Sequence, residues 1–350
     1  MPDGTVDMQP AIAQASATTT KKPTLKVVFD HLDLDTLLCL WALIFKMSKR
    51  YHVVPVLVNS GEHLPPEETE DCDVVYVDMG GGPCDHHGKK LENTSSFVLV
   101  AEKYGFVRDP GMSVLLDLSR RVDNAREVPW DSIAHTINGL VRDREFKDPT
   151  TGEPDYGTIL ALASKLFEIN YRQTFGRHQT QRDYQKCGAV TELLANGLKV
   201  VWVPKPRFRA VAFELDNADV VLWHSPVDPA DPTGPQMIQI GAHRDRFIDL
   251  TEIVAALRRG EIRSRELGTG MGDAALERIV ARYNRLDMVG THPDVEGWYL
   301  HDSLTLILCG SERHPLKEGE ATTMPLAHIF AALCHQLSLS GHKTEKAAAA

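Results

Sequence analysis

The sequence has no long apolar run, which excludes a helix that spans a bilayer. The longest apolar stretch, residues 37–45, is about half the length that such a helix needs. The first residues carry Asp3 and Asp7 before any basic residue, and they lack both the apolar segment of a secretory signal and the arginine-rich pattern of a transit peptide. We therefore expect a cytoplasmic protein with no membrane partner.

Cysteine is scarce and scattered, which excludes the common cysteine-based sites. None of the six cysteines forms a CxxC pair, so the sequence predicts neither a zinc knuckle nor a disulfide framework. Reduced thiols are the simplest interpretation. The six are Cys39, Cys72, Cys84, Cys187, Cys309 and Cys334.

Positive charge is in the minority. The chain carries 38 lysines and arginines against 48 aspartates and glutamates, a formal net charge of -10. A protein that coats long nucleic acid needs a wide basic surface, since phosphate neutralisation supplies most of such binding. A small phosphorylated substrate or a short single-stranded oligonucleotide is the partner that fits better.

The length of 350 residues, 43% of them hydrophobic, favours two folded domains. Tails without apolar periodicity are expected to be disordered at residues 1–23 and 343–350. Between them we expect a catalytic domain over residues 24–170, a helical linker over 171–198 and a smaller α+β substrate-binding domain over 199–342.

The first domain reads as an α/β fold. Apolar strands are expected at residues 25–29, 53–58 and 74–77, with an apolar helix at 36–46 between the first two. This strand, helix, strand spacing predicts a parallel sheet. Further helices are expected at residues 95–104, 114–122, 133–144 and 157–169.

The pattern changes after a long polar helix that is expected to cover residues 171–196. Short runs separated by turn-rich segments then indicate an antiparallel sheet in the second domain. The expected strands are residues 199–203, 209–214, 220–223 and 237–240, and the expected helices are 250–258 and 273–284.

Three polar residues follow the first strand at alternate positions. They are His31, Asp33 and Asp35, and alternate side chains of an extended segment point to the same side. The carboxyl ends of parallel strands are also where open α/β sheets bind ligands. The alternative is that Asp33 or Asp35 only caps the helix that begins at Thr36.

Two further groups of polar residues can reach the same edge. Asp78 ends an apolar strand, and three glycines and a proline then allow a tight reversal before Asp85, His86 and His87. Asp123 lies near the end of a predicted apolar helix. Alone it would be structural.

In order and spacing these segments resemble the four motifs of the DHH phosphoesterase superfamily. The resemblance covers residues 26–124 and is closest to the Myg-type branch (melanocyte proliferating gene family) of metal-dependent exonucleases, while the first motif is closer to that of RecJ-type enzymes. It implies a parallel-sheet catalytic domain and two divalent cations, with Mn²⁺ as the first candidate and Mg²⁺ as the second. The metal ligands that it implies are His31, Asp33, Asp35, Asp78, His86 and Asp123.

The resemblance also implies separate roles for neighbouring residues. Asp78 would bridge the two ions, His86 would be a ligand and His87 would face the substrate phosphate. Asp85 is the natural acceptor for a ring N–H of a neighbouring histidine, which would place it with His87 in the catalytic group. The alternative for Asp85 is a turn residue.

The second domain offers weaker candidates for substrate binding. Gly310 permits close backbone approach after a predicted strand, while Arg313 and His314 could bind phosphate oxygens. Arg244 lies in a short basic cluster, as do the residues around Phe208, whose ring could stack on a base. A plain surface turn and solvated charges are the alternatives.

The combined prediction is a two-metal phosphoesterase that cleaves phosphodiester bonds of short oligonucleotides or a nucleotide-like molecule by metal-activated hydroxide. A phosphoanhydride hydrolase acting on pyrophosphate or polyphosphate is the first alternative. A nucleotide-binding protein that has lost activity on the same fold is the second.

Overall fold

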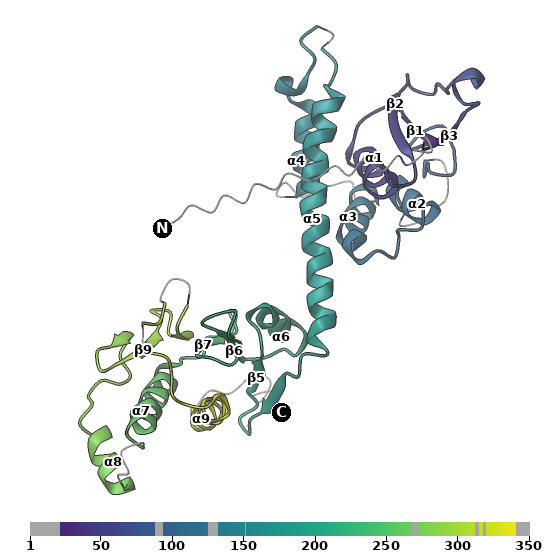
Figure 1. Cartoon of the computed structure of the whole chain (residues 1–350). Coiled ribbons are helices and arrows are strands. Elements are labelled where there is room, and N and C mark those ends of the chain that lie inside the picture. The colour runs from purple at the N-terminus through teal and green to yellow at the C-terminus, as the bar shows by residue number, and fades with distance from the viewer. Residues whose placement is uncertain are drawn as a thin grey trace, which may run out of the picture. The chain divides into compact units, whose positions relative to one another are not determined.

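The computed structural model describes residues 22–87, 94–124, 132–150, 152–267, 272–311, 315–317 and 320–340 (Figure 1). The chain divides into two compact units, Met1–Gly176 and Arg177–Ala350. The predicted tails lie outside the described residues apart from residues 22 and 23. Among the described helices, none combines the length and the apolar character that a membrane span requires.

The first unit contains a small parallel sheet, as the sequence predicts. Its strands are β1 (Thr24–Phe29), β2 (His52–Leu57) and β3 (Cys72–Tyr76), and β1 pairs in parallel with both neighbours in the order β2-β1-β3. The helices of this unit are α1 (Leu34–Met47), α2 (Ser96–Lys103), α3 (Ser113–Asn124), α4 (Ile133–Arg142) and the first part of α5 (Tyr156–Tyr184). All three strands therefore end at one edge of the sheet.

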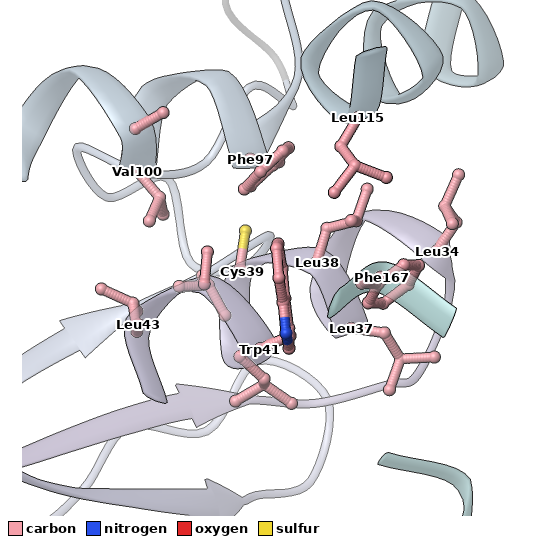
Figure 2. Packing of buried hydrophobic residues seen from close by; sticks show 14 of the residues in the cluster. Leu34, Leu37, Leu38, Cys39, Trp41, Leu43, Phe97, Val100, Leu115 and Phe167 are labelled. Atoms are coloured by element: carbon pink, nitrogen blue, oxygen red, sulfur yellow. The ribbon is translucent and has the colours of Figure 1, made fainter. Parts of the chain in front are cut away.

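Helix α1 is the centre of the first core. Every residue from Leu34 to Leu43 is buried, because the helix packs against β2, α2 and α3. Figure 2 shows apolar side chains of α1, α2, α3 and α5 meeting in one cluster around Trp41, Phe97 and Phe167. The core lies directly behind the carboxyl edge of the sheet and fixes the elements that carry the polar motifs.

Helix α5 extends this core. Ile159, Ala163 and Phe167 are fully buried at four-residue spacing, as expected for one face of a helix. Further along α5, Tyr171 makes a polar contact with the first unit. Its Oη accepts from Lys46 Nζ of α1 at 2.8 Å, and the same Nζ donates to Asp109 Oδ2 at 2.5 Å. The first unit thus holds this helix by both packing and a polar contact.

The second unit is built on a seven-stranded mixed sheet in the order β4-β5-β6-β7-β10-β9-β8. The strands are β4 (Val190–Leu193), β5 (Lys199–Val203), β6 (Val220–Pro226), β7 (Gln236–Ala242), β8 (Gly290–His292), β9 (Val295–Leu300) and β10 (Leu306–Cys309). The helices are α6 (Arg209–Leu215), α7 (Thr251–Leu267), α8 (Asp273–Val280) and α9 (Leu326–Leu339). Buried side chains of α7 and α9 share a core with the sheet.

Residues 209–214 form a helix, so the strand predicted there is wrong. Their apolar residues recur at helical spacing, and Val211 and Ala212 are buried against the sheet. Helix α6 is the crossover between β5 and β6, which pair in parallel. The sheet is therefore mixed and not wholly antiparallel as predicted.

The predicted polar helix over residues 171–196 is also too long. Helix α5 ends at Tyr184, and Gly188 with φ +71° redirects the chain into β4. Strand β4 then pairs antiparallel with β5, Val190 opposite Trp202. Residues 190–193, predicted as part of the linker, thus form an edge strand of the second unit, and residues 194–198 form the turn that leads into β5.

Replacing Phe167 with alanine should lower the free energy of unfolding of the first unit by about 3–5 kcal/mol, because the fully buried ring leaves a cavity beside Trp41. The matched control is Ile169→Ala on the same helix, where the side chain is 54% exposed and the change should stay within about 0.5 kcal/mol. Urea denaturation followed by circular dichroism measures both variants. Equal losses would contradict the assigned core.

Candidate metal centre

The candidate centre lies at the carboxyl edge of the parallel sheet, where a tight turn returns the chain to the end of β3. Val77 pairs with both β1 and Cys84, and Asp78 N donates to Cys84 O at 3.2 Å. Asp78 has φ +54°, a left-handed conformation that few residues other than glycine, asparagine and aspartate adopt readily. The turn brings residues 85–87 back to Asp78.

One group of possible ligands comes from the ends of β1 and β3. His31, Asp33 and Asp78 offer ligand atoms that lie within 4.8 Å of one another. His31 Nε2 is 3.4 Å from Asp78 Oδ2 and 3.9 Å from Asp33 Oδ2. Two carboxylates and an imidazole nitrogen therefore meet here.

A second group combines α1, the turn and α3. Asp35, His86 and Asp123 also offer ligand atoms within 4.8 Å of one another. His86 Nε2 is 3.7 Å from Asp123 Oδ2, while its Nδ1 is 3.3 Å from Asp78 Oδ1. Asp78 thus borders both groups, and the structure brings all six residues predicted as metal ligands into one centre.

Helix capping and ligand placement occur together at Asp33. Its Oδ1 accepts from Thr36 N at 2.8 Å and caps α1, while Oδ2 faces His31. Asp35 is not the cap. It is 2% exposed and lies in the first turn of α1, where it accepts from Phe97 N.

The buried carboxylates repel one another. Burial, together with the neighbouring charges of Asp78 and Asp33, raises the pKa of Asp35 to about 7. Burial and the charges of Asp35, Asp78 and Asp33 raise the pKa of Asp123 to about 9. Asp123 Oδ2 is buried without a hydrogen-bond partner. A divalent cation would neutralise this repulsion and satisfy that oxygen, so the residues fit a metal.

The same neighbouring charges and the same burial shift the pKa values of His31, Asp78 and His86. A hydrogen bond to Asp78 raises the pKa of His31 to about 9 against the effect of burial. Although burial alone would raise it, hydrogen bonds from His31 and Ser96 leave the pKa of Asp78 below its ordinary value. Burial lowers the pKa of His86, which favours the neutral imidazole that a metal ligand requires.

Helix α2 supplies contacts that the sequence analysis missed. Ser96 Oγ donates to Asp78 Oδ1 at 2.8 Å and lies 3.0 Å from His86 Nδ1. Ser119 Oγ on α3 donates to Asp35 Oδ1 at 2.5 Å. The signal was Ser95, a typical helix N-cap before an apolar run, which caps α2 through Val98 N and places its first turn at the centre.

The two adjacent histidines differ in their surroundings. His86 lies between Asp78 and Asp123, whereas the side chain of His87 is 60% exposed and its Nδ1 lies 3.3 Å from Asp78 Oδ1. Together with Asp78 and Asp85, the two histidines form a third group of possible ligands. Asp85 Oδ1 lies 3.0 Å from His87 Nδ1 and accepts from its backbone N–H, while Oδ2 accepts from Gly81 N at 2.7 Å. Asp85 is therefore both a turn residue and the partner of a histidine ring.

The candidates of the second unit are only partly described. Gly310, with φ +84°, lines a pocket of about 350 Å³ together with Tyr299, Leu308 and Lys317. Arg244 is exposed in the turn after β7 and does not line this pocket. The other two candidates, residues 313 and 314, lie outside the described residues.

Phe208 cannot stack on a base. Only 3% of the residue is exposed, and its ring packs in the core of the second unit against Tyr184. The basic cluster around it is partly paired, since Arg207 Nη2 donates to Asp183 Oδ2 at 3.0 Å. This part of the sequence interpretation is wrong because the aromatic residue serves packing.

The comparisons with known proteins leave the family open. No protein-family model matches the chain, and no curated protein matches it. One similar solved structure is described as a member of the s1p family of ribosomal proteins with a DHH domain; it is 14% identical, with a TM-score of 0.29, covering 92% of this chain and 88% of the other. A likeness at that level assigns neither fold nor activity, so the candidate centre rests on its own geometry.

The metal-free protein should lose stability as pH rises from about 4 to 9. The unfolded carboxyls titrate near 4, while those of Asp35 and Asp123 keep their protons to about 7 and 9. The folded state therefore binds more protons in this window, and each such proton lowers the free energy of unfolding by about 1.4 kcal/mol per pH unit. The stability that His31 contributes is likewise lost as pH rises through about 9.

The measurement is urea denaturation in chelator at several pH values. Asp123→Asn should flatten the slope, whereas Asp117→Asn, on an exposed face of the same helix, should leave it unchanged. Excess Mn²⁺ should raise the stability most at the alkaline end. A slope that is unaltered in Asp123→Asn would show that this carboxyl is not protonated in the folded state.

Proposed function

We propose that the chain is a two-metal-dependent phosphoesterase that hydrolyses phosphodiester bonds of short oligonucleotides or a nucleotide-like substrate. The observation that carries the proposal is the position of Asp78, whose carboxylate lies 3.4 Å from His31 and 3.3 Å from His86. One carboxylate that borders two groups of ligand atoms suits a pair of neighbouring ions. The order of the motifs along the chain supports the same activity through its resemblance to the DHH superfamily.

Each ion would have its own ligands. His31 and Asp33 would hold one ion, and Asp35, His86 and Asp123 the other, with Asp78 shared between them. When bound, the two ions would supply Lewis-acid activation of water and stabilisation of the charge on the phosphate. The mixed carboxylate and imidazole donors favour Mn²⁺, and Mg²⁺ is the second candidate.

His87 is the proposed contact to the substrate phosphate. Its exposed ring keeps Nδ1 toward Asp85, and this leaves Nε2 available to a ligand. In the protonated form Nε2–H would donate to a non-bridging phosphate oxygen and stabilise charge that grows in the transition state. Asp85 would hold the ring in that orientation.

The second unit is proposed to bind the remainder of the substrate, with Gly310 and the pocket beside it as the first candidate. Incubation of the full chain with Mn²⁺ and a panel of short RNA, short DNA, a cyclic dinucleotide and pyrophosphate tests the substrate class. Preferred cleavage of pyrophosphate would favour the phosphoanhydride hydrolase. Binding of nucleotides without any cleavage would favour the non-catalytic alternative.

The shared carboxylate should control both ions. Asp78→Asn keeps a residue that tolerates φ +54°, so the fold should persist while both Mn²⁺ sites weaken by at least about tenfold and turnover is lost. Asp33→Asn and Asp123→Asn should each weaken one site only. Calorimetric titration with Mn²⁺ measures this, and Asp71→Asn at an exposed position is the control. Two intact sites in Asp78→Asn would refute the arrangement.

Removing the two histidines should have different effects. His86→Ala should lose affinity for one ion, because its Nε2 lies 3.7 Å from Asp123 Oδ2 and His86 completes the group of Asp35 and Asp123. His87→Ala should bind Mn²⁺ within about threefold of the wild type but lower the rate roughly 10²- to 10³-fold, as for one lost transition-state donor. The comparison pairs calorimetry with initial rates. If His87→Ala loses metal as badly as His86→Ala, His87 is a ligand.

A further inference from the structure

Asp30 occupies a distinctive position next to the candidate centre. It directly follows β1 and precedes the first predicted ligand, and its side chain is 12% exposed. It belongs to none of the groups of possible ligands found among the described residues. A nearly buried carboxylate at the edge of a metal centre, outside its ligand set, requires another role.

The contact between Asp30 and His31 suggests that role. Asp30 Oδ1 lies 2.6 Å from His31 Nδ1, while the opposite nitrogen of the ring, Nε2, faces the carboxylates of Asp78 and Asp33 at 3.4 and 3.9 Å. The imidazole thus spans two environments. One nitrogen meets Asp30, and only the other is directed at the candidate ligand group.

Asp30 is itself held from a separate part of the chain. The Ser60 side chain and the backbone N–H of Gly61, in the loop after β2, face this carboxylate, and against the effect of burial they help to lower the pKa of Asp30. Gly61 adopts φ +77°, and Glu62 N donates to Asn59 O at 2.9 Å, which closes the loop into a turn. Donors from this loop therefore face the Asp30 carboxylate in addition to His31.

We propose that Asp30 is a positioning residue that orients His31 and selects its tautomer for metal binding, an inference that rests on the proposed two-metal function. The side chain of His31 is 48% exposed, so packing alone does not fix the ring. A hydrogen bond from Nδ1–H to Asp30 directs the Nε2 lone pair toward the ion. It also raises the basicity of the ligand, as carboxylate partners of metal-bound histidines do.

The first test is Mn²⁺ calorimetry on the full chain. Asp30→Ala should weaken one of the two sites by about 10- to 100-fold and leave the other within about threefold. Asp30→Asn, whose amide oxygen still accepts from Nδ1–H, should lose clearly less. Asp71→Ala is the control for removal of an exposed carboxylate. Circular dichroism confirms that each variant is folded.

The second test needs no metal. The Nδ1 proton of His31 should give a far-downfield resonance in the proton NMR spectrum, absent in His31→Gln and lost in Asp30→Ala but kept in Asp71→Ala. Ser60→Ala, which removes one of the contacts that hold Asp30, should leave this resonance in place but let it exchange faster with water.

The outcomes separate the inference from the proposed function. A wild-type chain that binds no Mn²⁺ contradicts the two-metal function itself. A wild type that binds two ions, together with Asp30→Ala that binds both equally well, overturns only the role of Asp30. Absence of the downfield resonance from the wild type also overturns it, since the contact on which the inference depends would then not exist.

Discussion

The first unit depends on one constraint, which is that several carboxylates lie close together and that Asp35, Asp78 and Asp85 among them are buried. Carboxyl groups that lie so close together cannot all ionise without compensation, and burial raises the free energy of ionising each of them. Neutral hydrogen-bond donors surround these carboxylates. Phe97 N, in the first turn of α2, and the Ser119 hydroxyl donate to Asp35. The Ser96 hydroxyl donates to Asp78. These donors hold the oxygens in place without cancelling their charge. In the metal-free protein Asp123 therefore keeps its proton to about pH 9, and a bound cation would displace that proton.

The apolar core behind the centre keeps this arrangement rigid. Helix α1 carries Asp35 at one end and is buried over most of its length, and α2 and α3, which supply the serines, pack on it through Phe97 and Leu115. A hydroxyl at 2.5–2.8 Å from its acceptor tolerates little displacement of the helices that carry it. The geometry of the site in this unit therefore depends on the stability of the core. This also explains why polar residues that never touch a ligand can be as constrained as those that do.

The sequence predicted the parts of the fold in which a local pattern decides the structure. The apolar strand before His31 marked the edge of the sheet, but the extended alternation expected through residue 35 ends early, because Asp33 caps α1 and Asp35 lies in its first turn. The donors Ser96 and Ser119 escaped because their role arises from the packing of two helices distant along the chain. The helix at residues 209–214 was read as a strand because short apolar runs fit both periods. Strand β4 was missed because its residues are all exposed at a sheet edge, so no apolar alternation marks it.

The left-handed backbone at Asp78 limits which amino acids evolution can place there. At φ +54° the chain readily accepts glycine, asparagine and aspartate, whereas glutamate, the other carboxylate, would carry the steric strain of a longer L side chain. In the proposed centre this residue must also be a carboxylate, because it is shared between two ions. The backbone and the chemistry thus select the same residue for independent reasons. Homologous chains that have lost the centre are therefore expected to carry asparagine or glycine at this position, which would serve as a record of that loss.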